Sequence, residues 1–286
     1  MSLLWADQLS VLMCPDRLLV AHRPRGFRAG SMTTTVVPVP VPVPSEGAAS
    51  WEPAAIKLES LLATTPEWQG AALRIILSNH FVRYALVPWS DHLGDEQEHL
   101  LFARHHFSLT HGPAAKGWAI RLSLDKPGKC HVASALDQAL LDRLTLVAEA
   151  SHLKLASVEP LLMAAFNRWR QDLREEAQWF VTVEDGMLCG ALVGRDRWIA
   201  LRRWRTQDDW VSELPLWLSR EQLIGEESAS VGAVYLLAPS RAGTDSMSMG
   251  APLRFLGKGE RNGNRNKTAH TAVQADEEAG HFSCIL

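Results

Sequence analysis

Histidine is the residue type whose clustering most strongly suggests chemistry in this chain of 286 residues. Seven of its 11 histidines lie between positions 80 and 131, namely His80, His92, His99, His105, His106, His111 and His131. His99 and His106 are separated by two helical turns, so they share one face of a helix, and imidazole is a common metal ligand. No HExxH pattern accompanies them. We therefore predict no metal site and interpret these side chains as a solvated helix face.

Basic and aromatic side chains are concentrated between residues 195 and 205. If this segment is a regular strand, alternation places Trp198, Arg202 and Trp204 on one face. Tryptophan and arginine dominate the energetics of protein interfaces, so we predict these three as partner-binding residues. Two alternatives stay open, namely nucleic-acid binding through stacking and phosphate pairing, and a solvated strand end on which arginine stems cover tryptophan.

Motifs of the common enzyme classes are missing from the sequence. It contains no GxSxG, no phosphate-binding P-loop and no GxGxxG. The glycines from Gly186 to Gly194 fall within a predicted hairpin, where we interpret them as close-packing positions. The four cysteines, Cys14, Cys130, Cys189 and Cys284, form no CxxC pair and are expected to be buried, reduced thiols. We predict no catalytic residue.

Composition narrows the class of protein further. The net charge is −3 at pH 7, which argues against a nucleic-acid binder driven by bulk charge. The first ten residues do not resemble a secretory signal, and no apolar run approaches the ~20 residues that cross a bilayer. We expect a cytoplasmic protein without direct membrane insertion, held at the inner face of the inner membrane, if at all, through a partner.

The elements that must position these residues follow a repeated order. Each copy is a meander of three strands followed by a helix and a strand, at 9–13, 18–22, 32–37, 53–63 and 73–77, and again at 179–183, 187–193, 198–204, 208–223 and 231–237. Between the copies lie first an inserted section of hairpin and helix, at 81–89, 95–110, 118–124 and 130–135, and then a helix, a strand and a helix at 137–150, 153–158 and 160–173. The pattern is a weak internal repeat of the βββαβα kind.

Two segments fall outside this order. Residues 37–44 alternate valine and proline, which predicts an extended polyproline II spacer. Residues 239–286 are rich in Gly, Ser, Arg and Asn, which predicts a disordered tail. We expect a first lobe at 8–175 that includes the insertion, and a second, truncated lobe at 176–238.

The repeat and one stretch of sequence together resemble a known family. Residues 73–84 (LRIILSNHFVRY), Pro88-Trp89, and the helix 137–150 that leads to the strand 155–158 and Glu159-Pro160 are similar to the actin-like assembly proteins of type IV pili and type II secretion, the PilM-like and GspL-like proteins. The resemblance covers about 8–238. It implies an α/β protein with two ribonuclease-H-like lobes facing each other across a nucleotide cleft, and a membrane-anchored protein partner.

The turns that would hold a nucleotide depart from the family pattern. Nucleotide-binding relatives carry an acid with Gly and Ser or Thr in the first hairpin turn of each lobe. Here the turns read CPDR at 14–17 and EDGM at 184–187, and no Gly-rich adenine loop follows 233–237. Asp16, Asp185 and Gly186 are the residual candidates for a nucleotide site. We predict a degenerate member, a pseudo-ATPase without ATP or magnesium.

Two alternatives to a non-catalytic scaffold remain. One is an ATP-binding relative in which different residues contact the phosphates. The other is a nucleic-acid-binding protein or nuclease of ribonuclease-H-like fold, which would hold metal on acids of the first strand. That strand, 9–13, contains no acid; Asp7 precedes it and Asp16 lies in the turn after it. No pattern in the sequence joins Asp125, Glu159 and Asp185 to these two acids.

Overall fold

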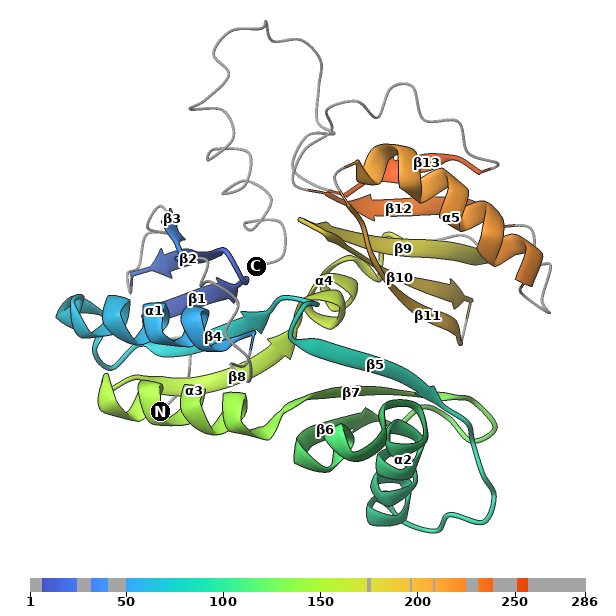
Figure 1. Cartoon of the computed structure of the whole chain (residues 1–286), viewed down its shortest axis with the longest axis horizontal. Helices are drawn as coiled ribbons and strands as arrows, with labels where there is room; N and C mark the ends of the chain where they lie inside the picture. The colour runs from blue at the N-terminus through green and yellow to red at the C-terminus, as the bar shows by residue number, and fades with distance from the viewer. Residues whose placement is uncertain are drawn as a thin grey trace, which may run out of the picture.

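The computed structural model describes residues 7–24, 32–40, 50–173, 176–195, 197–207, 209–224, 231–238 and 251–256 (Figure 1). Within these residues the chain forms two five-stranded sheets, each belonging to one lobe, and a three-stranded sheet that lies to the side of the first lobe. No helix of the described part is long and apolar enough to cross a membrane.

The first lobe is built on a mixed sheet with the order β3-β2-β1-β4-β8. Its strands are β1 (Gln8–Met13), β2 (Arg17–Arg23), β3 (Thr33–Pro38), β4 (Ala72–Leu77) and β8 (Lys154–Pro160). The meander β1-β2-β3 is antiparallel, whereas β1, β4 and β8 are parallel. Helices α1 (Glu52–Ala63) and α3 (Gln138–Ala150) pack together on the sheet, where Leu58 and Leu144 are fully buried.

The second lobe repeats this arrangement. Its strands are β9 (Ala177–Glu184), β10 (Met187–Gly194), β11 (Trp198–Arg205), β12 (Ala233–Leu237) and β13 (Leu253–Phe255), in the order β11-β10-β9-β12-β13. Helix α5 (Trp210–Ile224) buries Leu214 and Trp217 against this sheet. Because strand order and direction match those of the first lobe, the duplicated unit and the two-lobed α/β class predicted from the sequence are confirmed.

Helix α4 (Leu161–Trp169) lies between the two lobes (Figure 1). Pro160 precedes its first turn, which suits an extended residue at the helix boundary. Its side chains Leu162 and Ala165 are fully buried in a core that also contains Leu12 from the first sheet and Phe180 from the second. Burial of this shared core gives the two lobes a common apolar contact.

The inserted section forms a subdomain of its own on the first lobe. Strands β5 (Val82–Val87), β7 (His131–Asp137) and β6 (Trp118–Ser123) form an antiparallel sheet in the order β5-β7-β6. Helix α2 (Glu96–His111) covers it and buries Phe107. The side chain of Asp95 caps this helix by accepting a 2.8 Å hydrogen bond from the Glu98 amide.

Two predicted segments differ from the structure. The tail 239–286 was expected to be disordered, but its residues 251–256 include β13, which pairs in parallel with β12 and packs Leu253 and Phe255 on the core. The Val–Pro segment 37–44 was expected to be an extended polyproline II spacer after a strand that ends at Val37, but strand β3 continues to Pro38, which is tolerated at a sheet edge. Residues 41–44, 239–250 and 257–286 lie outside the described residues.

Candidate functional site

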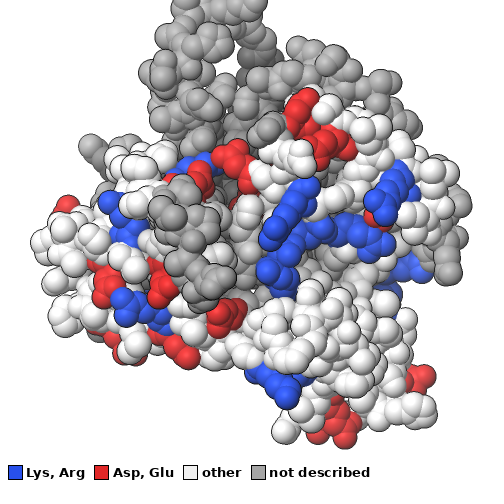
Figure 2. Space-filling model, viewed as in Figure 1, with Lys and Arg blue, Asp and Glu red and all other residues white. Residues whose placement is uncertain are grey.

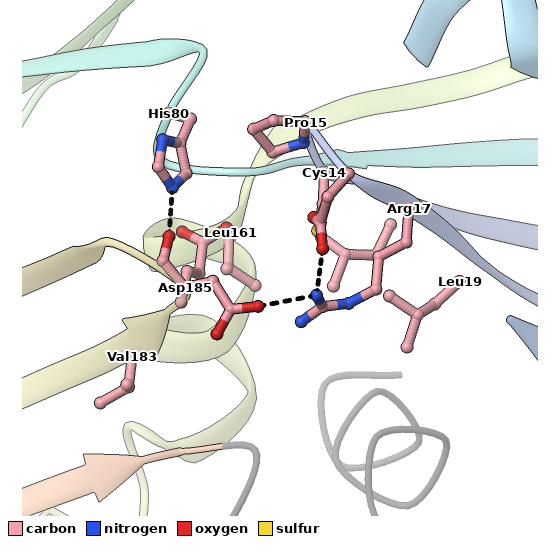
Figure 3. A pocket seen from close by; sticks show the side chains of 11 residues that line it. Cys14, Pro15, Arg17, Leu19, His80, Leu161, Val183 and Asp185 are labelled. Carbon is pink, nitrogen blue, oxygen red and sulfur yellow. Dashed lines mark hydrogen bonds and ion pairs between the residues drawn. The ribbon is translucent and has the colours of Figure 1, made fainter. Parts of the chain in front are cut away.

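The first hairpin turns of the two lobes face each other across a pocket (Figure 3). The first turn, residues 14–16, joins β1 to β2, and the second, Asp185-Gly186, joins β9 to β10. The pocket has a volume of about 380 Å³, and its lining combines apolar side chains such as Leu161 with charged ones. The sequence-predicted candidates Asp16 and Asp185 are therefore brought together, although nearly the whole first lobe lies between them in the sequence.

Arg17 occupies the space between the two acids. Its Nη1 contacts the carboxylate of Asp16 and donates a 3.0 Å hydrogen bond to Asp185 Oδ2 (Figure 3). The Arg17 side chain is only 16% exposed, whereas those of Asp16 and Asp185 are 40% and 78% exposed. One guanidinium thus pairs with the carboxylates of both turns and links the lobes.

His80 also contacts the turn at Asp185-Gly186. Its Nε2 lies 2.9 Å from the main-chain oxygen of Asp185, and its amide donates to Ser78 Oγ at 3.1 Å (Figure 3). His80 follows β4 in the first lobe, so the turn of the second lobe is held by two side chains of the first. Gly186 in this turn has φ = 67°, a left-handed conformation that favours glycine.

These turns fit a magnesium-bound triphosphate poorly. The Cys14 amide already bonds the Arg17 carbonyl at 2.9 Å, and Pro15 has no N–H, so two of the three residues in the first turn offer no amide to a phosphate. Asp16 and Asp185 both pair with Arg17, so these ion pairs would have to break before either carboxylate could help to hold a metal ion. The arrangement suits an ion-paired contact between the two lobes.

A buried polar network lies behind the pocket and centres on Asn79, which is fully buried. Its Oδ1 accepts a 2.7 Å hydrogen bond from Tyr84 Oη and a 3.3 Å bond from the Leu162 amide, and its Nδ2 donates to Thr182 Oγ1 at 3.0 Å. These partners come from β5, α4 and β9, so a single amide side chain joins both lobes and the helix between them.

Glu184 completes this network at the floor of the pocket. Its Oε2 accepts a 2.9 Å hydrogen bond from the main-chain N–H of Asn79. Burial raises the pKa of Glu184, and hydrogen bonds from Ser78 and Asn79 and the charge of His80 oppose that rise. Burial also raises the pKa of the neighbouring Tyr84 well above its usual value. The interior of this junction therefore favours uncharged side chains.

The predicted partner-binding residues Trp198, Arg202 and Trp204 do not share one face. Strand β11 contains a bulge: Trp198 pairs with Val193 and Ala200 pairs with Leu192, so Ile199 is an extra residue between two consecutive pairs. Because one extra residue reverses the alternation, Trp198 contacts Phe166 of α4 at a ring-centroid distance of 4.4 Å. Trp204 and Arg202 instead face α5.

Contacts to α5 engage both of these remaining candidates. Trp204 packs against Trp217, and Arg202 Nε donates a 2.7 Å hydrogen bond to Glu221 Oε2. The prediction that Arg202 and Trp204 bind a partner therefore concerns a surface that α5 already covers in part.

The other candidates from the sequence have structural partners. Glu159 receives two 2.9 Å hydrogen bonds from Arg74, which lower its pKa against the opposing effect of burial, and Asp7 lies 3.7 Å from His22. The interpretation of the histidines as a solvated face is wrong for His99, which is buried and contacts the buried ring of His131. In the described ranges, no group of three or more His, Cys, Asp or Glu could hold a metal.

The sequence did not predict the roles of three residues at the junction of the lobes, namely Arg17, Asn79 and Glu184. Arg17 is the last residue of the predicted turn at 14–17, and the position of a cation next to the turn acid Asp16 was the available signal. Asn79 lies within the stretch that carried the family resemblance, but a buried amide has no periodic signature. Glu184 directly precedes the Asp-Gly turn, and its burial depends on the packing of the two lobes.

Comparison with solved structures identifies the fold as actin-like. Of those similar to this chain, one is a Bacteroides thetaiotaomicron protein with an actin-like ATPase fold and unknown function, at 9% identity and a TM-score of 0.55, covering 81% of this chain and 82% of that one. No protein-family model matches the chain. No curated protein matches it either.

Two further structures come from assembly systems. The PilM–PilN type IV pilus biogenesis complex matches with a TM-score of 0.63 and 13% identity, over 99% of both chains. The cytoplasmic domain of EpsL, an inner-membrane component of the type II secretion system of Vibrio cholerae, matches with a TM-score of 0.52 and 12% identity, over 96% of this chain and 94% of that one. The resemblance expected from the sequence is confirmed at the level of the fold.

Proposed function

We propose that this protein is a non-catalytic scaffold that binds a segment of a membrane-anchored protein during the assembly of a pilus or a secretion system. It acts in the cytoplasm, at the inner face of the inner membrane, where its partner holds it. The similarity in fold to the PilM–PilN complex and to the EpsL domain, over nearly the whole chain, supports this assignment.

The position of Arg17 is the observation that supports the absence of catalysis in this proposal. A nucleotide-dependent protein of this fold would need the two opposed turns for phosphate and metal. Here Arg17 is held by the carboxylates of both turns, and Pro15 removes an amide donor. The contact that would depend on a nucleotide is replaced by one that the chain makes with itself.

Affinity purification from detergent-solubilised membranes of the source cell tests the partner. The tagged protein should recover a membrane-anchored component of a pilus or secretion system, and an untagged strain is the control. Recovery of soluble proteins alone, with no such component enriched, would contradict the scaffold assignment.

A second candidate, an ATP-binding relative, is favoured by the cation in the pocket. Asp185 is 78% exposed, so it could move away and leave Arg17 to pair with a phosphate. ATP hydrolysis that is lost in Arg17→Met would support this candidate over the scaffold.

A further inference from the structure

Three arginines gather where the second lobe meets the inserted subdomain. Arg83 is the second residue of β5, Arg205 is the last residue of β11, and Arg203 lies two residues before it. Arg203 Nη1 donates to the carbonyl oxygen of Val82 at 2.9 Å, and Arg83 Nη1 donates to the same oxygen at 3.2 Å. Figure 2 shows Lys and Arg side chains gathered over the middle of this face, between the second lobe and the inserted subdomain. Arg83, Arg203 and Arg205 are called the arginine cluster below.

The described residues supply no carboxylate that pairs with this cluster. In the part of the chain that the structure describes, none of the three arginines forms an ion pair with a carboxylate, in contrast to Arg17, Arg74, Arg143, Arg195 and Arg202. Burial, followed by the charges of Arg203 and Arg205, lowers the pKa of Arg83 to about 10. Burial and the charge of Arg205 lower the pKa of Arg203, although Cys189 and Tyr84 oppose that effect. Like charges are therefore held together without a paired carboxylate in the described ranges.

The guanidinium groups of Arg83 and Arg203 are held by main-chain carbonyls and keep further donors that have no acceptor among the described residues. Arg83 is anchored on the carbonyls of His80 and Val82, and Arg203 on those of Asn79 and Val82, in each case through Nη1 alone. Their Nε and Nη2 groups have no acceptor among the described residues. Guanidinium groups anchored in this way are preorganised to bind carboxylates through paired hydrogen bonds.

The surroundings favour an extended peptide as the source of those carboxylates. Within the described residues, β5 pairs only with β7 and β11 only with β10, so both are edge strands, and an edge strand can accept an extended segment. Arg83 and Arg203 are half-buried, so they lie too deep to follow a flat membrane surface. Three guanidiniums are also few against the 6–10 phosphate contacts of a typical duplex binder.

We propose that the arginine cluster, at the junction of strands β5 and β11, is a docking site for an extended acidic segment of a partner protein. This inference rests on the proposed function in one respect, namely that the partner is a segment of a protein. It adds the chemistry of that segment, which is acidic and extended. It also moves the partner surface from the face of β11 that carries Arg202 and Trp204 to the opposite face.

Fluorescence anisotropy with a rhodamine-labelled peptide of alternating Glu and Ser tests the site. The full-length protein should bind this peptide more weakly as salt is raised, and should not bind a matched peptide of alternating Gln and Ser. Each of Arg203→Gln and Arg205→Gln should raise the Kd roughly three- to tenfold. Arg220→Gln, an exposed arginine on α5 with the same change in net charge, should leave the Kd unchanged.

Folding and competing ligands are controlled in the same series. Arg203 also donates to two main-chain carbonyls, so the affinity of Arg203→Gln is used only if this variant keeps the melting temperature of the wild type. If it does not, Arg205→Gln and Arg205→Glu test the site, because Arg205 is exposed. Equal affinity for the Glu and Gln peptides, or unchanged affinity in Arg205→Glu, would overturn the proposal. So would tighter, cluster-dependent binding of single-stranded DNA or phosphatidylglycerol vesicles. If the membrane partner is still captured while the peptide fails, the scaffold stands and only this site falls.

Discussion

At the residue scale, Arg17 is the side chain on which the cleft depends. It is the mostly buried cation between two more exposed acids. Arg17→Met would leave Asp16 and Asp185 facing each other without a counter-charge. We expect the free energy of unfolding to fall by about 1–2 kcal/mol, measured by urea denaturation. Asp185→Asn should cost under about 0.5 kcal/mol because that carboxylate is largely in water. An Arg17→Met protein as stable as the wild type would contradict this role.

His131 makes the stability of the inserted subdomain dependent on pH. Burial, followed by the neighbouring His99, lowers the pKa of His131, with Asp125 opposing, and the Asp125 amide donates to its Nδ1 at 2.9 Å. The folded form therefore binds protons less readily than the unfolded chain. This contribution to stability is complete above the unfolded pKa of 6.5 and is lost as the pH falls below that value.

His131→Asn tests this dependence, since asparagine keeps an acceptor for the Asp125 amide but does not titrate. Melting temperatures between pH 8 and pH 5 should fall less steeply in His131→Asn than in the wild type. His105→Asn, on an exposed part of α2, is the control and should follow the wild type. Parallel curves for wild type and His131→Asn would show that this imidazole is not the titrating group.

At the element scale, one glycine sets how closely α5 approaches its sheet. A Cβ at Gly190 of β10 would lie 3.0 Å from Trp217 Cη2 and 3.3 Å from Trp179 Cε3. Gly190→Ala should destabilise the protein by about 1–3 kcal/mol because two packed indoles must move. Gly194→Ala is the matched control: its Cβ would meet the end of the flexible Ile199 side chain, at 3.3 Å. Chemical denaturation that found equal effects for the two variants would contradict this packing argument.

Local signals account for the elements that were predicted correctly. Asp185-Gly186 is a strong hairpin signal and does form the turn between β9 and β10. Asp137 precedes a regular apolar stripe and does cap α3, accepting from the Ala139 amide at 3.0 Å. The interpretation of glycines in this hairpin as close-packing positions is confirmed at Gly190.

The features that escaped prediction depend on long-range packing. Strand β13 has only three residues and is defined by its pairing with β12. The bulge that turns Trp198 toward α4 is invisible in a sequence whose alternation is unbroken. The turn acids of the candidate site were predicted, but their shared contact with Arg17 joins residues 168 positions apart. Such a contact exists only because of how the lobes pack.

At the scale of the whole molecule, Asn79 couples the lobes. Its side chain bonds partners from β5, α4 and β9 within one buried network. Asn79→Ala should lower the free energy of unfolding by about 2–4 kcal/mol and speed limited proteolysis near α4, because several buried polar groups lose their partner. Tyr84→Phe removes one of these bonds and should cost about 1 kcal/mol. If Asn79→Ala were no worse than Tyr84→Phe, the network would not act as a unit.

The duplicated lobes, the shared core around α4 and the contacts of Arg17 describe a molecule whose two halves are joined by its own side chains. The most direct test of this account is the melting temperature of the full-length protein with and without saturating Mg-ATP. Because a ligand that binds only the folded state must stabilise it, a scaffold without a nucleotide site should show no change. A saturable rise of several degrees that disappears in Arg17→Met would show that the cleft binds a nucleotide and would contradict the account.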